Sequence, residues 1–480
     1  MSSKRDDAVT PFDKKLTRRQ TLGAGAAAMA ATGLIGRSFV SAQTPASGNP
    51  VSPIAASGGL DDQEIHVFLF SGPENDAHKR LAPKFTDYTQ GKVKVTVEDG
   101  GRDVDYTTKR LAALQAGTDS YDVIHSDAQD FLQLGPAGFF APLNDFMSDT
   151  NLFDAAAYNL ADFPDSLLGL FQNSGNQLLL PQEASTLMFY YRTDLLEKYG
   201  VEAPPVTGWS FDDMRTAALS IQDQMNKEGL TDTYALVLGA KPQFHSAISI
   251  VQPAWAHGAE FFDADGKPTI DTQPMIDATT FMTNLLFEDK VVSPGVVGYE
   301  YPEVLTAFQQ GKAAMAIEWN AAASTIIDPA TSPITATTTA FSAFPFDATV
   351  GNTHQRVFPS VHAIGVSKFS KKQQAAFAYV AWFTSQDVAR DYVVNGGGSS
   401  GRASLLTDPD VLAKAPYYSA VLEGFKVYHP FPSLTQWPYV YNNILGVDFN
   451  SIWTQQTSVE DGIKQMQQET EDYLKDQGVL

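Results

Sequence analysis

The sequence predicts an α/β fold, because segments typical of buried strands alternate along the chain with segments typical of amphipathic helices. Residues 65–70 are almost all apolar, residues 93–97 alternate between apolar and polar, and residues 121–125 form a third strand-like run. Helical spacings of apolar residues at 77–88 and 106–116 separate these runs. Strand, helix, strand, helix and strand in this order indicate a parallel sheet with right-handed crossovers. A chain of 480 residues is long enough for one large or two medium domains.

Polar side chains follow each of the three predicted strands. In open parallel sheets, ligands bind beyond the carboxyl ends of the strands. A single polar residue in a loop is usually only solvated, whereas several that meet at one sheet edge indicate a site. The loops after these strands therefore nominate four ligand-binding residues, Glu74, Arg102, Asp127 and Gln129.

A further helix and strand are predicted between residues 302 and 320. Pro302 suits the start of a helix, and Gly311 suits the left-handed position at its end. The small and apolar residues 313–317 then predict a buried strand. A carboxylate, a large ring and an amide stand at its carboxyl end, where a ligand could bind or where the ring could simply belong to the core. These three candidates are Glu318, Trp319 and Asn320.

The composition excludes several classes of protein. The chain has no cysteine, which excludes disulfides, zinc–thiolate sites and a cysteine nucleophile. Its formal charge of −22 argues against a nucleic-acid partner, which would need a basic surface. No G-x-S-x-G or H-E-x-x-H motif occurs, and the eight histidines do not fall at metal-ligand spacing. A G-x-G-x-x-G string at 396–401 follows a predicted helix rather than a strand, so it does not predict a dinucleotide-binding site. We also predict no other cofactor and no metal site.

The first 42 residues have the features of a secretory signal. A pair of arginines, Arg18 and Arg19, precedes a mildly apolar run and small residues that offer a cleavage point. The pair resembles that of a twin-arginine signal. The apolar run is short and is interrupted by Arg37, which argues against a membrane anchor. We therefore expect export to the periplasm with removal of residues 1–42, which leaves a formal charge of −26 and a flexible leader at 43–60.

Three stretches resemble family 1 extracellular solute-binding proteins, the sugar-type receptors of ABC importers. Residues 308–315 read FQQGKAAM and match the family signature F-x-x-G-K-A-A-M. Pro181 precedes a strand that ends in YYRTDL at 190–195, similar to the family's pattern of proline, strand, tyrosine and "xxDL". Residues 204–209 are similar to its "PP-x-TW" element. The resemblance covers residues 61–475.

The resemblance implies a two-lobed periplasmic-binding-protein fold of type II. Each lobe would be a mostly parallel sheet flanked by helices, with the ligand cleft between the lobes. The first lobe would comprise residues 61–183 and 321–361, and the second lobe residues 184–320 and 362–480. The strands that connect the lobes would act as a hinge on which they close around the ligand.

The resemblance also places further residues at the cleft. Glu183 lies at the first crossing between the lobes, and Ser360 and His362 lie where the chain crosses again. The glycine-rich loop at 395–402 faces the cleft in the family. The proline-broken segment 430–441 and an apolar helix earlier in the chain each offer one tryptophan, although such a ring could also belong to the core. These features nominate seven residues, Glu183, Trp255, Ser360, His362, Gly398, Arg402 and Trp437.

The expected function is that of a periplasmic receptor for a neutral carbohydrate or polyol, which it delivers to the membrane permease of an ABC importer. Aromatic rings suit the apolar faces of sugars, and polar side chains suit their hydroxyls. A receptor for an anionic ligand such as a phosphoester stays open because of Arg102 and Arg402. A secreted carbohydrate hydrolase or lyase would need a carboxylate pair such as Glu183 and Glu318, whose separation the sequence does not fix. We expect a monomer without enzymatic activity.

Overall fold

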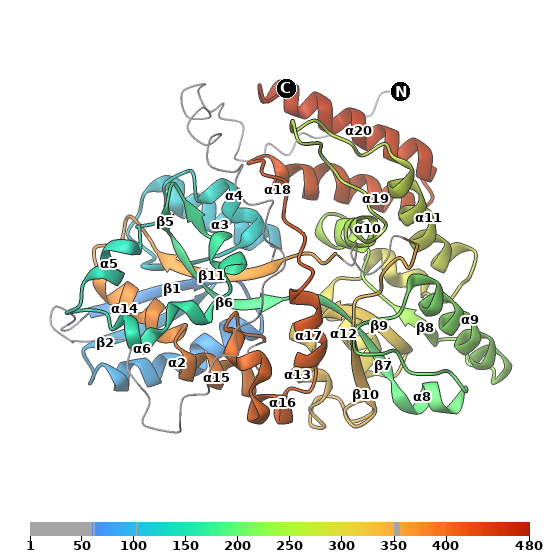
Figure 1. Ribbon diagram of the computed structural model, residues 1–480, viewed down its shortest axis with the longest axis horizontal. Coiled ribbons are helices and arrows are strands. Elements are labelled where there is room, and N and C mark those ends of the chain that lie inside the picture. The colour runs from blue at the N-terminus through green and yellow to red at the C-terminus, as the bar shows by residue number, and fades with distance from the viewer. Residues whose placement is uncertain (1–59, 61–62, 102, 350–355, 397) are drawn as a thin grey trace.

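The computed structural model describes residue 60 and residues 63–101, 103–349, 356–396 and 398–480. The chain forms two lobes, each built on one β-sheet surrounded by helices (Figure 1). The predicted signal peptide, all but the last residue of the predicted leader, and Arg102 lie outside the described residues.

The sheet of the first lobe has five strands in the order β2-β1-β3-β11-β6. These strands are β1 (Gln63–Leu69), β2 (Val93–Asp99), β3 (Val123–Asp127), β6 (Leu179–Ser185) and β11 (Ser360–Val366). β1 pairs in parallel with β2 and β3, which confirms the parallel arrangement predicted from the sequence. β11 runs antiparallel between β3 and β6. The carboxyl ends of β1, β3 and β6 and the amino end of β11 therefore lie at the same edge.

Helices with the predicted apolar faces cover this sheet. α2 (Pro73–Tyr88) and α3 (Asp103–Ala116) are the crossovers between the first three strands. α14 (Gln373–Phe383) packs against four strands of the sheet. Leu81 and Phe85 of α2 are buried, as their helical spacing predicted.

The sheet of the second lobe has four strands in the order β10-β7-β9-β8. These strands are β7 (Leu187–Arg192), β8 (Tyr234–Val237), β9 (Ala313–Trp319) and β10 (Thr339–Ala343). β8 and β9 are parallel, while β7 is antiparallel to both of its neighbours. Both sheets are thus mixed, but in each of them all strands except one run in the same direction, which agrees with the expectation of mostly parallel sheets. The exceptions are β11 and β7, the strands that enter from the other lobe.

The helix and strand predicted between residues 302 and 320 are confirmed. The helix is α12 (Tyr301–Gln309), and Gly311 follows it with a left-handed φ of 71°. The strand is β9, in which every residue is buried. Glu318 and Trp319 therefore stand at the end of a strand in the centre of the second sheet.

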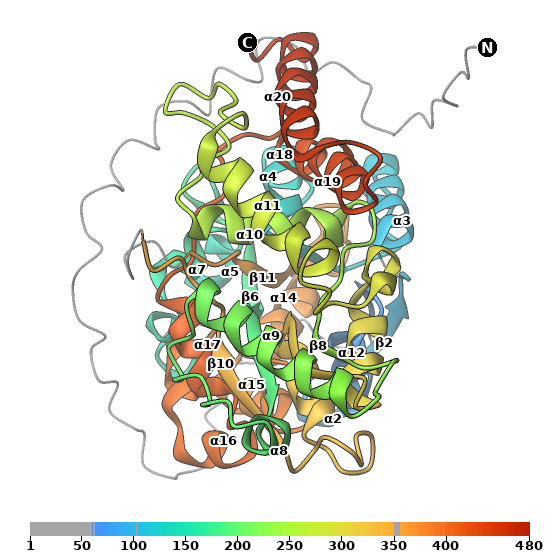
Figure 2. The same ribbon diagram turned by 90° about the vertical axis from the view of Figure 1, so that its right-hand side faces the viewer.

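Five further helices belong to the second lobe. They are α9 (Phe211–Lys227), α10 (Phe244–Ala256), α11 (Gln273–Phe287), α19 (Gly446–Trp453) and α20 (Val459–Asp476). α10 packs against α11 and α19, and α20 packs against the same two helices (Figure 2). The end of the chain thus belongs to the second lobe.

The remaining elements are short. They are α4 (Ala128–Leu134), α5 (Asn144–Ser148), α6 (Ala155–Tyr158), η1 (Leu160–Asp162), α7 (Asp165–Gly169), β4 (Gln172–Asn173), β5 (Asn176–Gln177), α8 (Thr193–Lys198), η2 (Pro294–Gly298), η3 (Asn320–Ala322), α13 (Ala323–Ile326), α15 (Gln386–Val394), η5 (Ala403–Thr407), α16 (Pro409–Lys414), α17 (Tyr418–Phe425), α18 (Trp437–Tyr439) and the π-helical η6 (Val440–Leu445).

Two segments depart from the predicted division of the chain into lobes. β10 lies within residues 321–361, which were expected in the first lobe, yet it pairs with β7 in the second. Most of β11 and all of α14 lie after residue 361, where the second lobe was expected, yet both belong to the first. Pairing between segments far apart in sequence decides the lobe, and no local pattern reveals that pairing.

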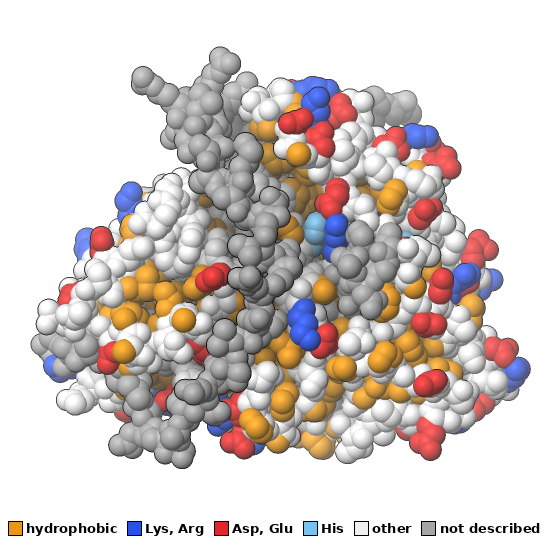
Figure 3. Space-filling view, viewed as in Figure 1, with side chains coloured by type: hydrophobic (Ala, Val, Ile, Leu, Met, Phe, Trp, Pro, Cys, Tyr) orange, Lys and Arg blue, Asp and Glu red, His pale blue; other side chains and the backbone are white. Residues whose placement is uncertain are grey.

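The two lobes also touch each other away from the connecting strands. α4 of the first lobe lies against α18 of the second, and the two helices are neighbours in both views (Figures 1 and 2). On the face shown in Figure 3, Lys and Arg side chains are dispersed over both lobes, and many stand beside Asp or Glu. Among the helices of the described residues, none is both long enough and apolar enough to cross a membrane.

Candidate functional site

Four ionisable side chains meet at the edge of the first sheet where the strand ends converge. They form the carboxylate–histidine cluster, defined as Glu74, His125, Glu183 and His362. His362 Nδ1 donates a hydrogen bond to a carboxylate oxygen of Glu74 and lies 3.8 Å from Glu183 Oε2. His125 Nε2 lies 3.9 Å from Glu74 Oε2. The His362 side chain is 19% exposed, whereas the other three are almost completely buried. His362 is therefore the member that solvent or a ligand can reach.

The Glu74 carboxylate is held in place from the side of the sheet. Glu74 lies in the first turn of α2, just after the carboxyl end of β1. Gln182 Nε2 donates a 2.5 Å hydrogen bond to Glu74 Oε2, and Gln182 Oε1 lies 2.7 Å from His78 Nε2. Burial lowers the pKa of His78 to about 3, so this imidazole is neutral and donates its Nε2 proton to Gln182. This chain of hydrogen bonds fixes the orientation of the carboxylate.

Glu183 is the second carboxylate of the cluster and lies near the carboxyl end of β6. It accepts hydrogen bonds from Ser185 Oγ at 2.5 Å and from Tyr392 Oη at 3.1 Å. Gly398 approaches so closely that a Cβ atom there would lie 2.6 Å from Glu183 Oε1, and its φ of 118° is one that side chains disfavour. Burial, and then the neighbouring Glu74 carboxylate, raise the pKa of Glu183 well above its ordinary value. A carboxyl group in this state can donate as well as accept a hydrogen bond.

Asp127 and Gln129 lie at the same edge, where β3 passes into α4. Asp127 Oδ1 accepts a 2.8 Å hydrogen bond from the Asp130 N–H and so caps the helix. Burial and the charge of Asp130 raise the pKa of Asp127 to about 6, against the opposing charge of Arg110. Gln129 is buried, and its Nε2 has no hydrogen-bond partner among the described residues. The Gln129 amide is therefore a donor that a ligand can satisfy.

Buried rings of the second lobe gather around Phe358, directly before β11. They form the aromatic cluster, defined as Trp255, Trp319, Phe358, Trp437 and Tyr441. The Phe358 ring lies 6.0 Å from Trp255, 6.2 Å from Trp319 and 5.5 Å from Tyr441 between centroids, and Trp437 lies 5.5 Å from Tyr441. Trp437 Nε1 and Tyr441 Oη are buried without a hydrogen-bond partner in the described part of the chain. Tyr441 belongs to a π-helical turn, an irregularity that is frequent at functional sites.

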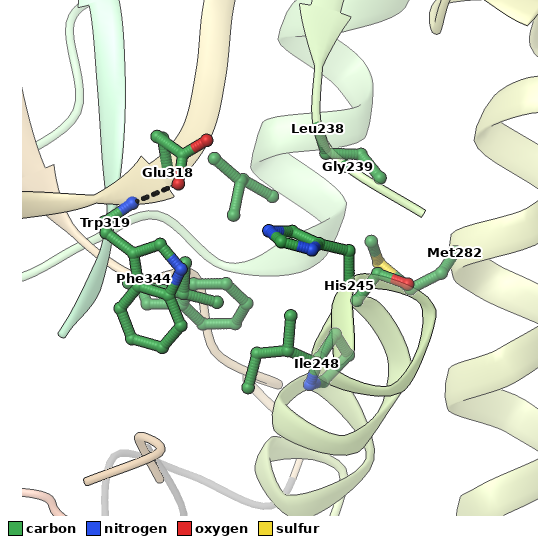
Figure 4. Close-up of a pocket in the computed structure, with 12 residues that line it drawn as sticks. Leu238, Gly239, His245, Ile248, Met282, Glu318, Trp319 and Phe344 are labelled. Carbon is green, nitrogen blue, oxygen red and sulfur yellow. Dashed lines mark hydrogen bonds between the residues drawn. The ribbon is translucent and has the colours of Figure 1, made fainter. Parts of the chain in front are cut away.

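A cavity in the second lobe lies beside Trp319. Glu318 and Trp319 line it from the end of β9, and His245 and Ile248 of α10 line it from the opposite side (Figure 4). Glu318 Oε1 accepts a 2.7 Å hydrogen bond from the Trp319 N–H. Every residue that lines this cavity belongs to the second lobe. Glu183 and Glu318, the pair considered for carbohydrate hydrolysis, thus stand on the sheets of different lobes.

Two of the nominated residues are fully engaged in holding the fold together. Asn320 is buried, accepts a 2.6 Å hydrogen bond from the Thr186 N–H, and donates to Ser399 Oγ. Arg402 is buried and forms an ion pair with Asp162, with Arg402 Nη1 3.2 Å from Asp162 Oδ2.

The remaining donors of Arg402 reach backbone oxygens. Its Nε donates to Thr384 O at 2.7 Å, its Nη2 donates to Tyr158 O at 3.0 Å, and its Nη1 also donates to Asn159 O at 3.3 Å. The guanidinium therefore presents no exposed surface to a ligand.

The structure brings together most of the residues nominated from the sequence, but in two groups. Glu74, Asp127, Gln129, Glu183 and His362 lie at the edge of the first sheet, and Trp255, Trp319 and Trp437 lie in the aromatic cluster, with Glu318 beside it. Ser360 is half-buried at the start of β11, and Gly398 serves as the close neighbour of Glu183.

Sequence reasoning missed four residues that complete these groups. They are His125, Gln182, Phe358 and Tyr441. Three of them could have been found from their positions next to nominated features of the sequence. His125 stands at the end of a predicted strand, Gln182 precedes Glu183, and Phe358 precedes Ser360 by two positions. Only the pairing of β11 with β3 and β6 shows that the first two belong with His362.

The comparisons with known proteins agree with this architecture. The family model for bacterial extracellular solute-binding proteins matches residues 71–390. A probable amino-acid ABC transporter periplasmic-binding protein of Sinorhizobium fredii is 25% identical over 413 residues, covering 85% of this chain and 87% of that protein. The mannitol-binding protein of Pseudomonas aeruginosa is 26% identical over 351 residues, covering 72% of this chain and 75% of that protein.

Solved structures share the fold over nearly their whole length. Maltose-bound MalE3 of T. maritima aligns with a TM-score of 0.76 at 22% identity, covering 86% of this chain and all of that chain. A solute-binding protein of Agrobacterium vitis with bound D-mannitol aligns with a TM-score of 0.74 at 22% identity, covering 87% and 99%. Because the family model spans well over half of the sequence and the two-lobed fold agrees with it, this chain belongs to the bacterial extracellular solute-binding protein family.

Proposed function

We propose that this protein captures a neutral carbohydrate or polyol between its lobes and delivers it to the membrane permease of an ABC importer. The observation that carries the proposal is the spacing of Phe358 and His362. Phe358 is the centre of the aromatic cluster in the second lobe, and His362 is the accessible member of the carboxylate–histidine cluster in the first. Three residues separate them on the segment that joins the lobes. One ligand can therefore meet rings on one side and polar groups on the other.

The chemistry of the two clusters matches that of a sugar or polyol. Hydroxyl groups both donate and accept hydrogen bonds, and the first lobe offers a carboxyl with a raised pKa in Glu183 and an unpaired amide donor in Gln129. The C–H faces of such ligands are apolar and pack on aromatic rings such as Trp319 and Trp437. The names of relatives support this class, since one is a mannitol-binding protein and two solved neighbours hold maltose and D-mannitol.

We assign ligand contact to residues of both lobes. In the first lobe these are Glu74, Asp127, Gln129, Glu183 and His362, and in the second lobe Trp255, Glu318, Trp319 and Trp437. Asn320, Gly398 and Arg402 support the site from behind. Arg102 and Ser360 remain candidates on the evidence of the sequence.

A receptor for an anionic ligand is less well supported than a receptor for a neutral one. The anionic class was considered because of Arg102 and Arg402. The Arg402 guanidinium already donates hydrogen bonds to Asp162 and to backbone oxygens. The Glu74 carboxylate would repel a phosphoester at the edge of the first sheet. A relative named for amino-acid transport makes free amino acids a further class to be tested.

The other expectations from the sequence are part of the same proposal. We expect a periplasmic monomer, exported through its twin-arginine signal, that returns its ligand chemically unchanged. The separation of Glu183 and Glu318 onto different lobes supports binding over hydrolysis. The dispersed cationic side chains in Figure 3 support the absence of a nucleic-acid partner.

Isothermal titration calorimetry against a panel of polyols, sugars, amino acids and glycerophosphodiesters tests the proposal. We expect a single binding site for a polyol or sugar, with unchanged ligand recovered afterwards. The variant Gln129→Ala should weaken binding at least tenfold while leaving stability almost unchanged, because its Nε2 has no hydrogen-bond partner to lose among the described residues. The control Gln386→Ala removes an amide that bonds to Ser404 on the outside of the first lobe, and it should bind normally. Binding of a phosphodiester or an amino acid alone would overturn the proposed ligand class.

Small-angle X-ray scattering tests the closure of the lobes. A hinged receptor becomes more compact when its ligand bridges the lobes, so the radius of gyration should fall at saturation. An unchanged radius of gyration under calorimetrically verified saturation would indicate a rigid site and contradict capture by closure.

A further inference from the structure

We propose that Glu74, His125 and His362 form a binding site for one divalent transition-metal ion, best suited to Zn²⁺, at the edge of the first sheet. Their ligand atoms all lie within 4.8 Å of one another. The two histidines are 237 positions apart in sequence and meet only because β11 pairs with β3. For this reason, the sequence contains no metal-ligand spacing motif that would predict the site.

The tautomer of His125 points its lone pair at the Glu74 carboxylate. Tyr106 Oη donates a 2.9 Å hydrogen bond to the backbone oxygen of His125, so its oxygen is left to accept from His125 Nδ1, 3.1 Å away. The ring proton is thereby placed on Nδ1, and Nε2 carries the lone pair. His125 Nε2 is buried, lies 3.9 Å from Glu74 Oε2, and has no hydrogen-bond partner among the described residues. A metal ion at this point would satisfy the His125 Nε2 lone pair, which no donor among the described residues reaches.

The surroundings of the three residues are those of metal ligands. A hydrogen bond from the second ring nitrogen typically orients a ligating histidine, and Tyr106 supplies it for His125. Gln182 Nε2 orients Glu74 in the same way. On binding, the ion takes the place of the Nδ1 proton in the His362–Glu74 hydrogen bond, and the neutral imidazole keeps its one proton on Nε2.

The donor set selects the kind of ion. Two imidazole nitrogens and one carboxylate favour Zn²⁺ and its neighbours over Mg²⁺ and Ca²⁺, which prefer oxygen ligands. Bonds of about 2.0–2.2 Å to tetrahedral Zn²⁺ put ligand atoms roughly 3.3 Å apart, so a small inward shift of the side chains closes the site. Glu183 Oε2, 3.8 Å from His362 Nδ1, is the neighbouring carboxylate that would supply a fourth ligand.

The experiment uses the whole chain without an affinity tag, stripped of metal with a chelator. Equilibrium dialysis against Zn²⁺ measures stoichiometry and affinity, and the visible spectrum after addition of Co²⁺ reports the nitrogen ligands and tetrahedral geometry. We expect one ion per chain, a Co²⁺ spectrum typical of a tetrahedral site with nitrogen ligands, and no binding of Mg²⁺ or Ca²⁺. Zn²⁺ should also raise the melting temperature of the wild-type protein.

Variants identify the ligands. His362→Gln and His125→Gln should each weaken Zn²⁺ binding by more than tenfold, whereas His66→Gln, in the middle of β1 and outside the cluster, should bind like the wild type. Circular dichroism checks that each variant is folded, and His362, the more exposed histidine, provides the test if His125→Gln does not fold. The proposal is overturned if the folded wild type binds neither Zn²⁺ nor Co²⁺ at micromolar concentration, or if His362→Gln binds them unchanged. All measurements are made without sugar, so their outcome is independent of the proposed ligand class.

Discussion

Two hydrogen bonds join Asn320, at the end of a strand of the second lobe, to Thr186, on the segment that crosses between the lobes. Asn320 Oδ1 accepts from the Thr186 N–H at 2.6 Å, and the Asn320 N–H donates to Thr186 O at 3.1 Å. Thr186 lies between β6 and β7, and Asn320 directly follows β9. The pair therefore anchors the crossing segment to the end of a central strand of the second lobe.

Asn320→Ala should destabilise the protein by about 1–3 kcal/mol, because it leaves the buried N–H of Thr186 without a partner. Urea unfolding measures this change. Asn151→Ala, at an exposed position, is the control and should change the free energy of unfolding by less than about 0.5 kcal/mol. Equal stability of the two variants would show that this anchor does not contribute to the fold.

Arg402→Ala should cost about 3–5 kcal/mol of stability, because it leaves the buried Asp162 carboxylate unpaired. Arg215→Ala is a matched control: its ion pair with Asp289 is partly exposed on the arginine side and should contribute about 1 kcal/mol or less. Chemical denaturation compares the two. If Arg402→Ala instead unfolds like the wild type and loses ligand, the arginine contacts the ligand, and the anionic class regains its support.

Trp319→Ala and Trp437→Ala should each weaken binding of a neutral ligand by about 2 kcal/mol, roughly thirtyfold, since buried aromatic anchors carry much of the affinity. Trp382→Ala removes a buried tryptophan of the first lobe, away from the aromatic cluster, and controls for lost stability. Calorimetry at two salt concentrations should show little dependence on salt. Normal affinity in both variants, or a strong effect of salt, would contradict the proposed contact between the aromatic cluster and a neutral ligand.

Acid should destabilise the protein partly through His78. Its pKa is lowered to about 3 in the fold by burial, against 6.5 as the ordinary value, so the unfolded chain binds a proton that the folded chain does not. The stability contributed by neutral His78 is fully present above about pH 6.5 and is lost as the pH falls towards 3. The slope from this one group is on the order of 1.4 kcal/mol per pH unit.

His78→Gln keeps a donor for Gln182 but cannot titrate, so urea unfolding of this variant between pH 7 and 4 should show a shallower loss of stability. His66→Gln, at a partly exposed position, serves as the control and should retain the wild-type slope. The same slope in His78→Gln and the wild type would show that His78 is not the group responsible.

Export should depend on the paired arginines. Replacing Arg18 and Arg19 by Lys should leave precursor in the cytoplasm, because the pair is what a twin-arginine receptor recognises. Arg37→Lys preserves the pair and should be exported normally. Fractionation and immunoblotting report the outcome, and periplasmic protein from the double variant would show that another export route is used.

The strand ends were the most informative part of the sequence. Glu74, Asp127 and Glu183 follow or end runs of apolar residues, and parallel strands bring such ends to one edge regardless of the distance in sequence. All five first-lobe residues assigned to ligand contact could be nominated in this way or from the resemblance, with no knowledge of the pairing. His125 was missed because it lies inside the predicted strand rather than after it, and only the neighbouring strand β11 gives it a partner.

The residues whose roles were misjudged are those with distant partners. Arg402 has the residue type of a ligand-binding arginine, but Asp162, 240 positions away, already neutralises it. Asn320 and Thr186 are 134 positions apart. The division into lobes failed at β10 and β11 for the same reason, because local patterns predict a strand but not the sheet that it joins.

The contact between Gly398 and Glu183 restricts how this binding site can evolve. Alanine at position 398 would place its methyl group 2.6 Å from Glu183 Oε1, and Ser185 and Tyr392 hold that carboxylate so that it cannot simply turn away. The left-handed backbone at 398 excludes larger residues independently. New ligand preferences must therefore arise elsewhere, through the rings of the second lobe, while position 398 is limited to the one residue without a side chain.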